Sequence, residues 1–232
     1  MNILLFFAIG AFLAFILNDK REIFLANTIS LTGGILLAYI CFEMLPVAFN
    51  MWGLYKSVIF ILIAVMLTSF IEHQINIIGI KNNNKNNFFK FSAMLAIVIA
   101  VHNLPEGLAL GAMYNHNPKN TIKLSILIGL HCLPESFSYA LISNANKIDA
   151  RKTVADIFKM TLPLLFGIFI GAFFTTITTN FVATILSLTG GVMLYITCGD
   201  VIPETHKLGS GVLTSIFSVV GFVIGIIIIF LL

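Results

Sequence analysis

Two short motifs place a histidine and a glutamate at the same spacing in two consecutive apolar segments. The first is VHNLPEGLALG (residues 101–111), which contains His102 and Glu106. The second is GLHCLPESFSYAL (residues 129–141), which contains His131 and Glu135. Residues four apart share one face of a helix, so each motif presents an imidazole and a carboxylate together. One such cluster could arise from packing alone, but two with the same spacing suggest a shared ligand.

The ligand that suits these side chains is a divalent transition metal. Imidazole nitrogen with carboxylate oxygen favours Zn²⁺, Mn²⁺, Fe²⁺ or Co²⁺, whereas Mg²⁺ and Ca²⁺ prefer all-oxygen shells. Asn103 and Cys132 follow the two histidines and are candidates for a fifth ligand or a neighbouring weak site. Pro105 and Pro134 each remove a backbone N–H and leave a carbonyl without its helical partner. The competing interpretation is a polar clasp that only joins two helices.

The composition indicates where these motifs lie. Of the 232 residues, 59% are hydrophobic and only 10% are charged, whereas a soluble domain has about 25% charged residues. This excludes a soluble protein and predicts an integral membrane protein. The net charge of +3 is too small to indicate a nucleic-acid partner. The three cysteines lie in apolar segments, which argues against a disulfide framework.

The chain is predicted to be an all-α polytopic membrane protein, a single transporter domain over residues 1–232. A membrane-spanning helix needs about 20 mostly apolar residues, and the polar connections between such segments are too short to hold a soluble domain. Ionisable residues near the middle of such a helix are costly, so both motifs are read as functional. Eight spans are expected, at about 3–17, 23–49, 58–80, 91–114, 121–143, 154–178, 180–204 and 211–232.

The positive-inside rule gives the expected orientation. With the N-terminus outside, nine basic residues fall in the inner connections and only three in the outer ones, so both termini are predicted outside. The inner residues are Lys20, Arg21, Lys81, Lys85, Lys90, Lys147, Arg151, Lys152 and Lys207, and the outer ones are Lys56, Lys119 and Lys123.

A longer repeat links the second and seventh predicted spans. SLTGGILLAYICFEMLP (residues 30–46) and SLTGGVMLYITCGDVIP (residues 187–203) align without gaps, and 8 of their 17 positions are identical. The expected topology sends these two spans through the membrane in opposite directions, as in transporters built from inverted repeats. Spans 1–3 are therefore expected to repeat as spans 6–8 around the central spans 4 and 5.

Ionisable residues outside the two motifs are candidates for the ion pathway. Glu43 and Asp200 occupy equivalent positions of the repeat, near the expected outer and inner mouths. Asp200, Glu204 and His206 are candidates for the inner exit, and Glu72 and His73 for a relay of metal or protons. The alternative for each is a polar residue that only reaches the membrane interface.

The motifs and their context resemble the ZIP (Zrt/Irt-like) family of divalent metal-ion transporters, in particular its short bacterial-type members. The resemblance rests on eight spans, HNLPEG on the fourth and H-x-x-P-E on the fifth. It implies a pathway between spans 2, 4, 5 and 7, import of metal into the cytoplasm across the cell membrane, and a homodimer. It also implies a transport site formed by His102, Asn103, Glu106, His131 and Glu135.

The chain departs from the family where a second metal would bind. Leu162 precedes Pro163, where family members with two metals carry an acidic residue, and Cys132 replaces a frequent Asp or Asn. One principal ion is therefore expected, with Zn²⁺ as the first choice and Fe²⁺, Mn²⁺, Co²⁺ or Cd²⁺ as alternatives. No resident cofactor and no enzymatic activity are expected. The rival functions are an intramembrane metalloenzyme, although H-E-x-x-H and a separate base are missing, and a metal receptor without transport.

Overall fold

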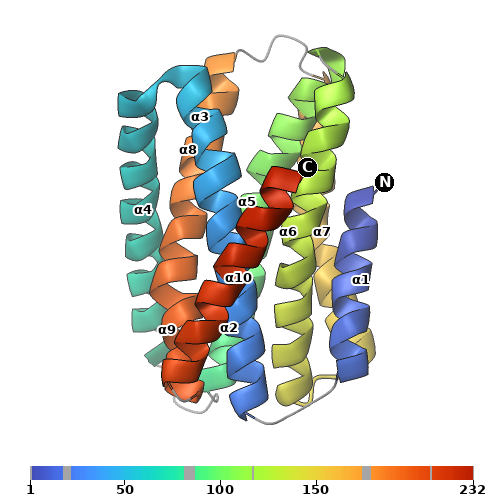
Figure 1. Cartoon of the computed structure of the whole chain (residues 1–232), viewed down its shortest axis with the longest axis vertical. Coiled ribbons are helices and arrows are strands. Elements are labelled where there is room, and N and C mark those ends of the chain that lie inside the picture. Colours follow the sequence, from blue (N-terminus) through green and yellow to red (C-terminus); the bar gives the residue numbers. More distant parts are fainter. Residues whose placement is uncertain are drawn as a thin grey trace.

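The computed structural model is a bundle of long helices (Figure 1). It describes residues 2–17, 22–80, 87–116, 118–173, 179–209 and 211–231, and every regular element in these ranges is helical, which confirms the all-α class. The elements are α1 (Asn2–Leu17), α2 (Glu22–Tyr39), η1 (Ile40–Met44), α3 (Leu45–Trp52), α4 (Leu54–Ile80), α5 (Asn87–His116), α6 (Pro118–Ala145), α7 (Ala150–Phe173), α8 (Thr179–Ile196), η2 (Thr197–Val201), α9 (Ile202–Leu208) and α10 (Gly211–Leu231).

Six segments of the described chain are long and apolar enough to cross a membrane, so this is a multi-pass membrane protein. They are Glu22–Trp52, Leu54–Gln74, Leu124–Ala145, Ala150–Phe173, Asn180–Leu208 and Gly211–Leu231. Ile3–Leu17 is a shorter apolar helix. The first and fourth predicted spans therefore stay predictions. Part of the sixth span (residues 174–178) and several basic residues used for orientation (Lys20, Arg21, Lys81 and Lys85) lie outside the described residues.

Each copy of the sequence repeat contains one π-helical segment, and the two occur at matching positions. These segments are η1 and η2, and each is followed by a proline, Pro46 or Pro203, in the first turn of the next helix. The wider turn is closed by the N–H of Leu45 on the Ile40 carbonyl, and by the N–H of Ile202 on the Thr197 carbonyl. Proline has no N–H to continue the regular ladder, which explains why the helix is rearranged just before it.

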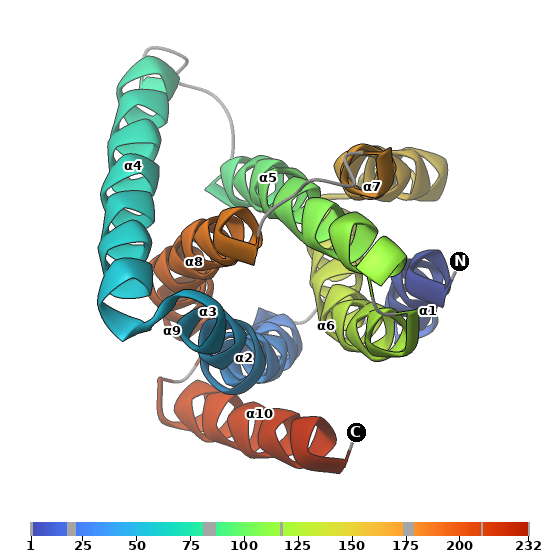
Figure 2. The same cartoon turned by 90° about the horizontal axis from the view of Figure 1, so that it is seen from above.

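The helices pack in two groups, and both histidine–glutamate motifs lie in the first of them, on α5 and α6. The most extensive contacts within the first group join α5 to α7 and α1 to α6, and those within the second join α2 to α10 and α4 to α8. Seen from above, α1, α5, α6 and α7 lie on one side of the bundle, and α2, α3, α4, α8, α9 and α10 on the other (Figure 2). Contacts of α2 with α6 and of α5 with α8 join the two groups.

Glycines bring α5 and α7 into backbone contact. A Cβ added at Gly107 or Gly111 of α5 would overlap the carbonyl oxygen of Leu164 or Ile168 on α7. The relation is mutual, because a Cβ at Gly167 or Gly171 of α7 would overlap a carbonyl oxygen of α5. Both helices thus carry a G-x-x-x-G pattern, the spacing that lets membrane helices approach closely. Gly107 directly follows Glu106, so this packing sets the rotation of α5 at the first motif.

Hydroxyl groups add polar links between α2 and its neighbours. Ser30 Oγ donates to the Thr214 carbonyl at 2.7 Å and lies 2.8 Å from Ser218 Oγ, which joins α2 to α10. Thr32 Oγ1 and Ser138 Oγ lie 2.7 Å apart and join α2 to α6. These contacts help to define how α2 is rotated against α10 and α6.

Candidate metal site

The two histidine–glutamate motifs meet between α5 and α6, and each histidine contacts the glutamate of the other helix. His102 Nε2 lies 3.0 Å from Glu135 Oε1, and His131 Nε2 lies 3.1 Å from Glu106 Oε2. All four side chains are at most 3% exposed. The pairs are therefore reciprocal between the two helices. The spacing within one motif predicts a shared face, whereas the direct contacts run from one motif to the other.

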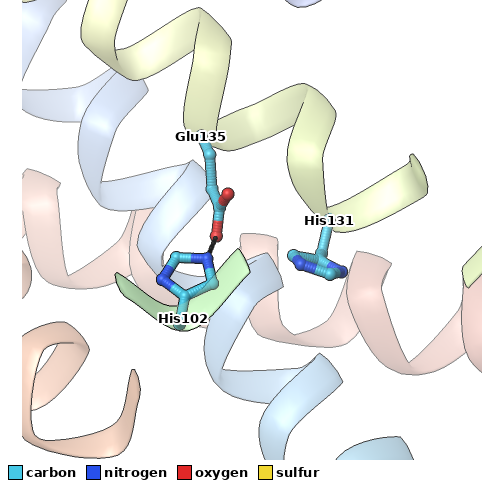
Figure 3. Close-up of side chains that lie close together, drawn as sticks. All are labelled: His102, His131 and Glu135. Atoms are coloured by element: carbon cyan, nitrogen blue, oxygen red, sulfur yellow. Dashed lines mark ion pairs between the residues drawn. The ribbon is translucent and has the colours of Figure 1, made fainter. Parts of the chain in front are cut away.

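The side chains around these pairs form two overlapping groups with the chemistry of metal ligands. His102, His131 and Glu135 present ligand atoms within 4.8 Å of one another, and so do Glu106, His131 and Cys132. His131 belongs to both groups. Figure 3 shows His131 and Glu135 projecting from α6 toward His102, with the ion pair of Glu135 and His102 drawn as a dashed line. Ligands of a tetrahedral Zn²⁺ lie about 3.3–3.8 Å apart, so either group would have to contract around a bound ion.

Each glutamate has one carboxylate oxygen that could bind a metal ion. Glu106 Oε1 and Glu135 Oε2 are buried and have no hydrogen-bond partner in the part of the chain that the structure describes. Leaving a buried polar group unsatisfied costs about 1–3 kcal/mol, and more for a charged group. A cation held between α5 and α6 would offset this cost, which is the reason why the arrangement suits a metal ion better than a purely structural clasp.

Asn103 and Cys132, the residues that follow the two histidines, have different surroundings. Asn103 is fully buried, and its Nδ2 donates to the Met160 carbonyl of α7 at 2.9 Å. Cys132 is also fully buried, and its Sγ lies 3.8 Å from His131 Nε2. Asn103 therefore links α5 to α7 through its amide nitrogen, while Cys132 lies within the cluster. A ligand role of either residue stays a prediction.

Leu162 does not face the cluster. Its side chain is 45% exposed on α7, whereas its neighbour Thr161 is buried and donates to the Phe158 carbonyl. Position 162, where the acidic residue is missing, therefore points away from the cluster.

The candidate pathway residues Glu43 and Asp200 lie in the two π-helical segments. Glu43 belongs to η1 and Asp200 to η2, and both are half-buried. A π-helical segment inside an α-helix frequently occurs at a functional position. The two carboxylates thus occupy equivalent positions of the repeat, and the backbone has the same π-helical distortion at both.

Glu72 of α4 accepts a hydrogen bond from a tyrosine in the second copy of the repeat. Tyr195 Oη of α8 donates to Glu72 Oε2 of α4 at 2.6 Å. His73, the next residue along α4, is exposed. The two residues therefore point in different directions, and their proposed joint role as a relay stays a prediction.

Replacing Tyr195 with phenylalanine should weaken the attachment of α4 to α8 without changing the shape of the side chain. The loss of this hydrogen bond to a carboxylate is expected to lower the free energy of unfolding by about 1–2 kcal/mol. The measurement is thermal unfolding of the detergent-solubilised protein. Tyr55→Phe is the matched control, because Tyr55 is 86% exposed. Equal unfolding temperatures of the two variants would show that the contact contributes nothing to stability.

The last two candidate exit residues have well-defined contacts in α9. Glu204 Oε2 pairs with Lys207 Nζ at 2.9 Å. The ring nitrogens of His206 lie 2.9 Å from the Ile202 carbonyl and 2.8 Å from Ser215 Oγ of α10. In this conformation the imidazole of His206 therefore links α9 to α10, and its role in an ion pathway stays a prediction.

Tyr39 is a residue of the site that the motifs do not reveal. Its ring stacks on the His131 ring, with the centroids 4.2 Å apart and the planes inclined by 22°. Tyr39 is the last residue of α2 and is 5% exposed. The only signal in the sequence is that Tyr39 precedes Glu43 by four residues, and this spacing is too common to single it out.

The comparison with known families matches most of the chain, including both motifs. The profile described as "ZIP Zinc transporter" matches residues 86–232, which begin just before α5 and run through α10. The matched region includes all four members of the reciprocal histidine–glutamate pairs and the second copy of the repeat. The first copy lies before the match and is connected to the second by its sequence identity. The chain belongs to the ZIP zinc transporter family.

Proposed function

We propose that this protein imports a divalent metal ion, with zinc as the main substrate, through a transport site formed by His102, Glu106, His131 and Glu135. Membership of the family implies divalent metal transport. The observation that carries the assignment of the site is the reciprocal pairing of the four buried side chains between α5 and α6. Buried ionisable groups in a membrane protein are costly and mark ion pathways.

The protein is proposed to span the cell membrane eight times, with both termini outside and an inverted repeat of spans 1–3 and 6–8. Two observations support the repeat: η1 and η2 occur at matching positions, and α2–α3 and α8–α9 run in opposite directions along the bundle (Figure 1). Both chain ends lie toward the same end of the bundle (Figure 1). The ion at the central site is then exposed alternately to each side. A homodimer in the lipid bilayer is a further expectation.

The donor atoms support zinc over harder cations. Two imidazoles and two carboxylates, with a thiol beside them, offer the nitrogen, oxygen and sulfur ligands that Zn²⁺ accepts. Fe²⁺, Mn²⁺, Co²⁺ and Cd²⁺ share parts of this preference and are alternative substrates. Asn103 and Cys132 are proposed as supplementary ligands. Glu43, Glu72, His73, Asp200, Glu204 and His206 are proposed to line the path that leads to and from the site.

Uptake into proteoliposomes tests the proposed transport. Purified protein is reconstituted, and zinc accumulation is followed with an internal fluorescent indicator, with protein-free liposomes as the control. Saturable uptake that Cd²⁺, Co²⁺, Mn²⁺ or Fe²⁺ reduces by competition is the expected result. Zinc binding without accumulation would instead support the metal receptor, and hydrolysis of an added peptide would support the metalloenzyme. Repeating the assay at two pH values shows whether protons are coupled to transport.

A further inference from the structure

The two histidine–glutamate pairs have the same chemistry but different surroundings. His102 and Glu135 border a cavity of about 30 Å³ between α2, α5, α6 and the α8–η2 segment. Thr32, Met193 and Ile196 are among its lining residues. This volume is large enough for a water molecule, since about 10–15 Å³ is the minimum for one. The pair formed by His102 and Glu135 is therefore next to open space.

The second pair is covered by an aromatic ring. Tyr39 stacks on one face of the His131 imidazole at a centroid distance of 4.2 Å, and His131 in turn contacts Glu106. Tyr39 and His131 are 5% and 1% exposed. Because the stacked ring occupies one face of the imidazole, it restricts rotation of His131 and keeps Nε2 directed at Glu106. Cys132, fully buried, lies in the same group of ligands.

The sequence repeat has different residues at the position that faces each pair. Ile196 is the residue of the second copy that aligns with Tyr39 in the first. Ile196 lines the cavity beside His102 and Glu135, whereas Tyr39 covers His131. Each residue directly precedes the π-helical segment of its copy. Equivalent positions thus face the two pairs, but only the first has a flat ring to stack on the imidazole.

We propose that Tyr39 is a positioning residue of the transport site. Its ring holds the His131 imidazole against Glu106 and closes this side of the cluster, so that in this conformation an ion passes on the side of His102 and Glu135. The expected effect of Tyr39 on transport rests on the proposed function. The closure of the cluster by the Tyr39 ring does not, because it concerns only the geometry of the protein without metal. Because α2 and α6 belong to different groups of helices, the stack is also a contact between the two groups.

Labelling of the natural Cys132 thiol tests the closure without any metal. The full-length protein is solubilised in detergent and treated with a maleimide, and modification of each cysteine is followed by peptide mass spectrometry. Tyr39→Ile introduces the residue found at the equivalent position of the second repeat. It is expected to increase the rate of Cys132 labelling by up to about tenfold, the equivalent of losing an aromatic pair. Tyr39→Phe keeps the ring and should label at the original rate.

A matched control and a second measurement separate the positioning of His131 by Tyr39 from a general loosening of the helix packing. Ile196→Ala removes side-chain volume at the equivalent position and should leave Cys132 labelling unchanged. In zinc uptake, Tyr39→Ile should raise the half-saturating zinc concentration by about three- to tenfold, and Tyr39→Phe should restore the normal value. Tyr39→Leu provides a second aliphatic variant if the isoleucine protein is poorly folded.

The possible outcomes distinguish this inference from the proposed function. Equal Cys132 labelling in the original protein and both aliphatic variants would overturn the role of Tyr39, as would a phenylalanine variant that behaves like the isoleucine one. An unchanged half-saturating zinc concentration in Tyr39→Ile would overturn positioning of His131. If the original protein fails to take up zinc, the proposed function fails, but the labelling comparison still decides whether Tyr39 closes the cluster.

Discussion

Replacing Glu106 with glutamine is expected to abolish zinc uptake while the protein still inserts and folds. The amide keeps the shape of the side chain but loses the charge that faces His131 and that would bind a cation. Loss of even an outer-shell partner typically weakens metal binding by 10–100-fold, so we expect uptake to fall by at least about 100-fold. Because the two pairs are reciprocal, Glu135→Gln should have a comparable effect.

Uptake of radiolabelled zinc by proteoliposomes measures this effect, and size-exclusion chromatography checks that each variant is folded. Asp156→Asn is a suitable control, because Asp156 lies on α7 and contacts Lys159 and Tyr139 rather than the cluster. It should transport zinc at the original rate. Normal zinc uptake by Glu106→Gln would show that the cluster is not the transport site, although membership of the family would be unaffected.

Replacing Gly167 with leucine is expected to separate α5 from α7 and to destabilise the whole protein. A Cβ at this position would overlap the Leu104 carbonyl oxygen, and a backbone atom cannot move aside as a flexible side chain can. Overpacking typically costs 1–3 kcal/mol, and we expect a loss of about 3 kcal/mol or more here. Since α5 carries His102 and Glu106, the protein that still folds should also bind zinc more weakly.

Thermal unfolding in detergent and the monodisperse fraction after purification measure the loss of stability. Gly199→Leu is the matched control, because Gly199 is exposed and a Cβ added there has no neighbour within 4 Å. It should unfold at the original temperature. A Gly167→Leu protein as stable as the original would show that α5 and α7 can move apart at little cost, and that their close approach does not position the first motif.

The all-helical membrane fold could be predicted from the sequence because its causes are local. Long apolar segments can satisfy their backbone hydrogen bonds inside a membrane only as helices or closed barrels, and the helical period puts His102 on the same face as Glu106. The repeat was also visible in the sequence, because 8 of 17 positions are identical. The π-helical form of η1 and η2 was not predicted, although Pro46 and Pro203 mark where the regular ladder is interrupted.

The partners of the site residues depended on the tertiary structure. Sequence spacing shows which residues share a face of one helix, but not how that helix is rotated against its neighbours. The rotation of α5 depends on contacts far apart in the chain, such as Gly107 against Leu164 and Asn103 against Met160. For this reason the sequence could not predict that each histidine contacts the glutamate of the other motif.

The sequence by itself determined the types of ligand, their spacing and the family of this protein. Only the tertiary structure decided that His131 is shared by two groups of potential metal-binding side chains, that Cys132 lies in one of them and that the Tyr39 ring stacks on His131. The physical reason is that the ability of a side chain to bind a metal depends on its residue type, which the sequence gives directly. The stacking of Tyr39 on His131 depends on the packing of α2 against α6, which forms only when distant segments of the chain meet.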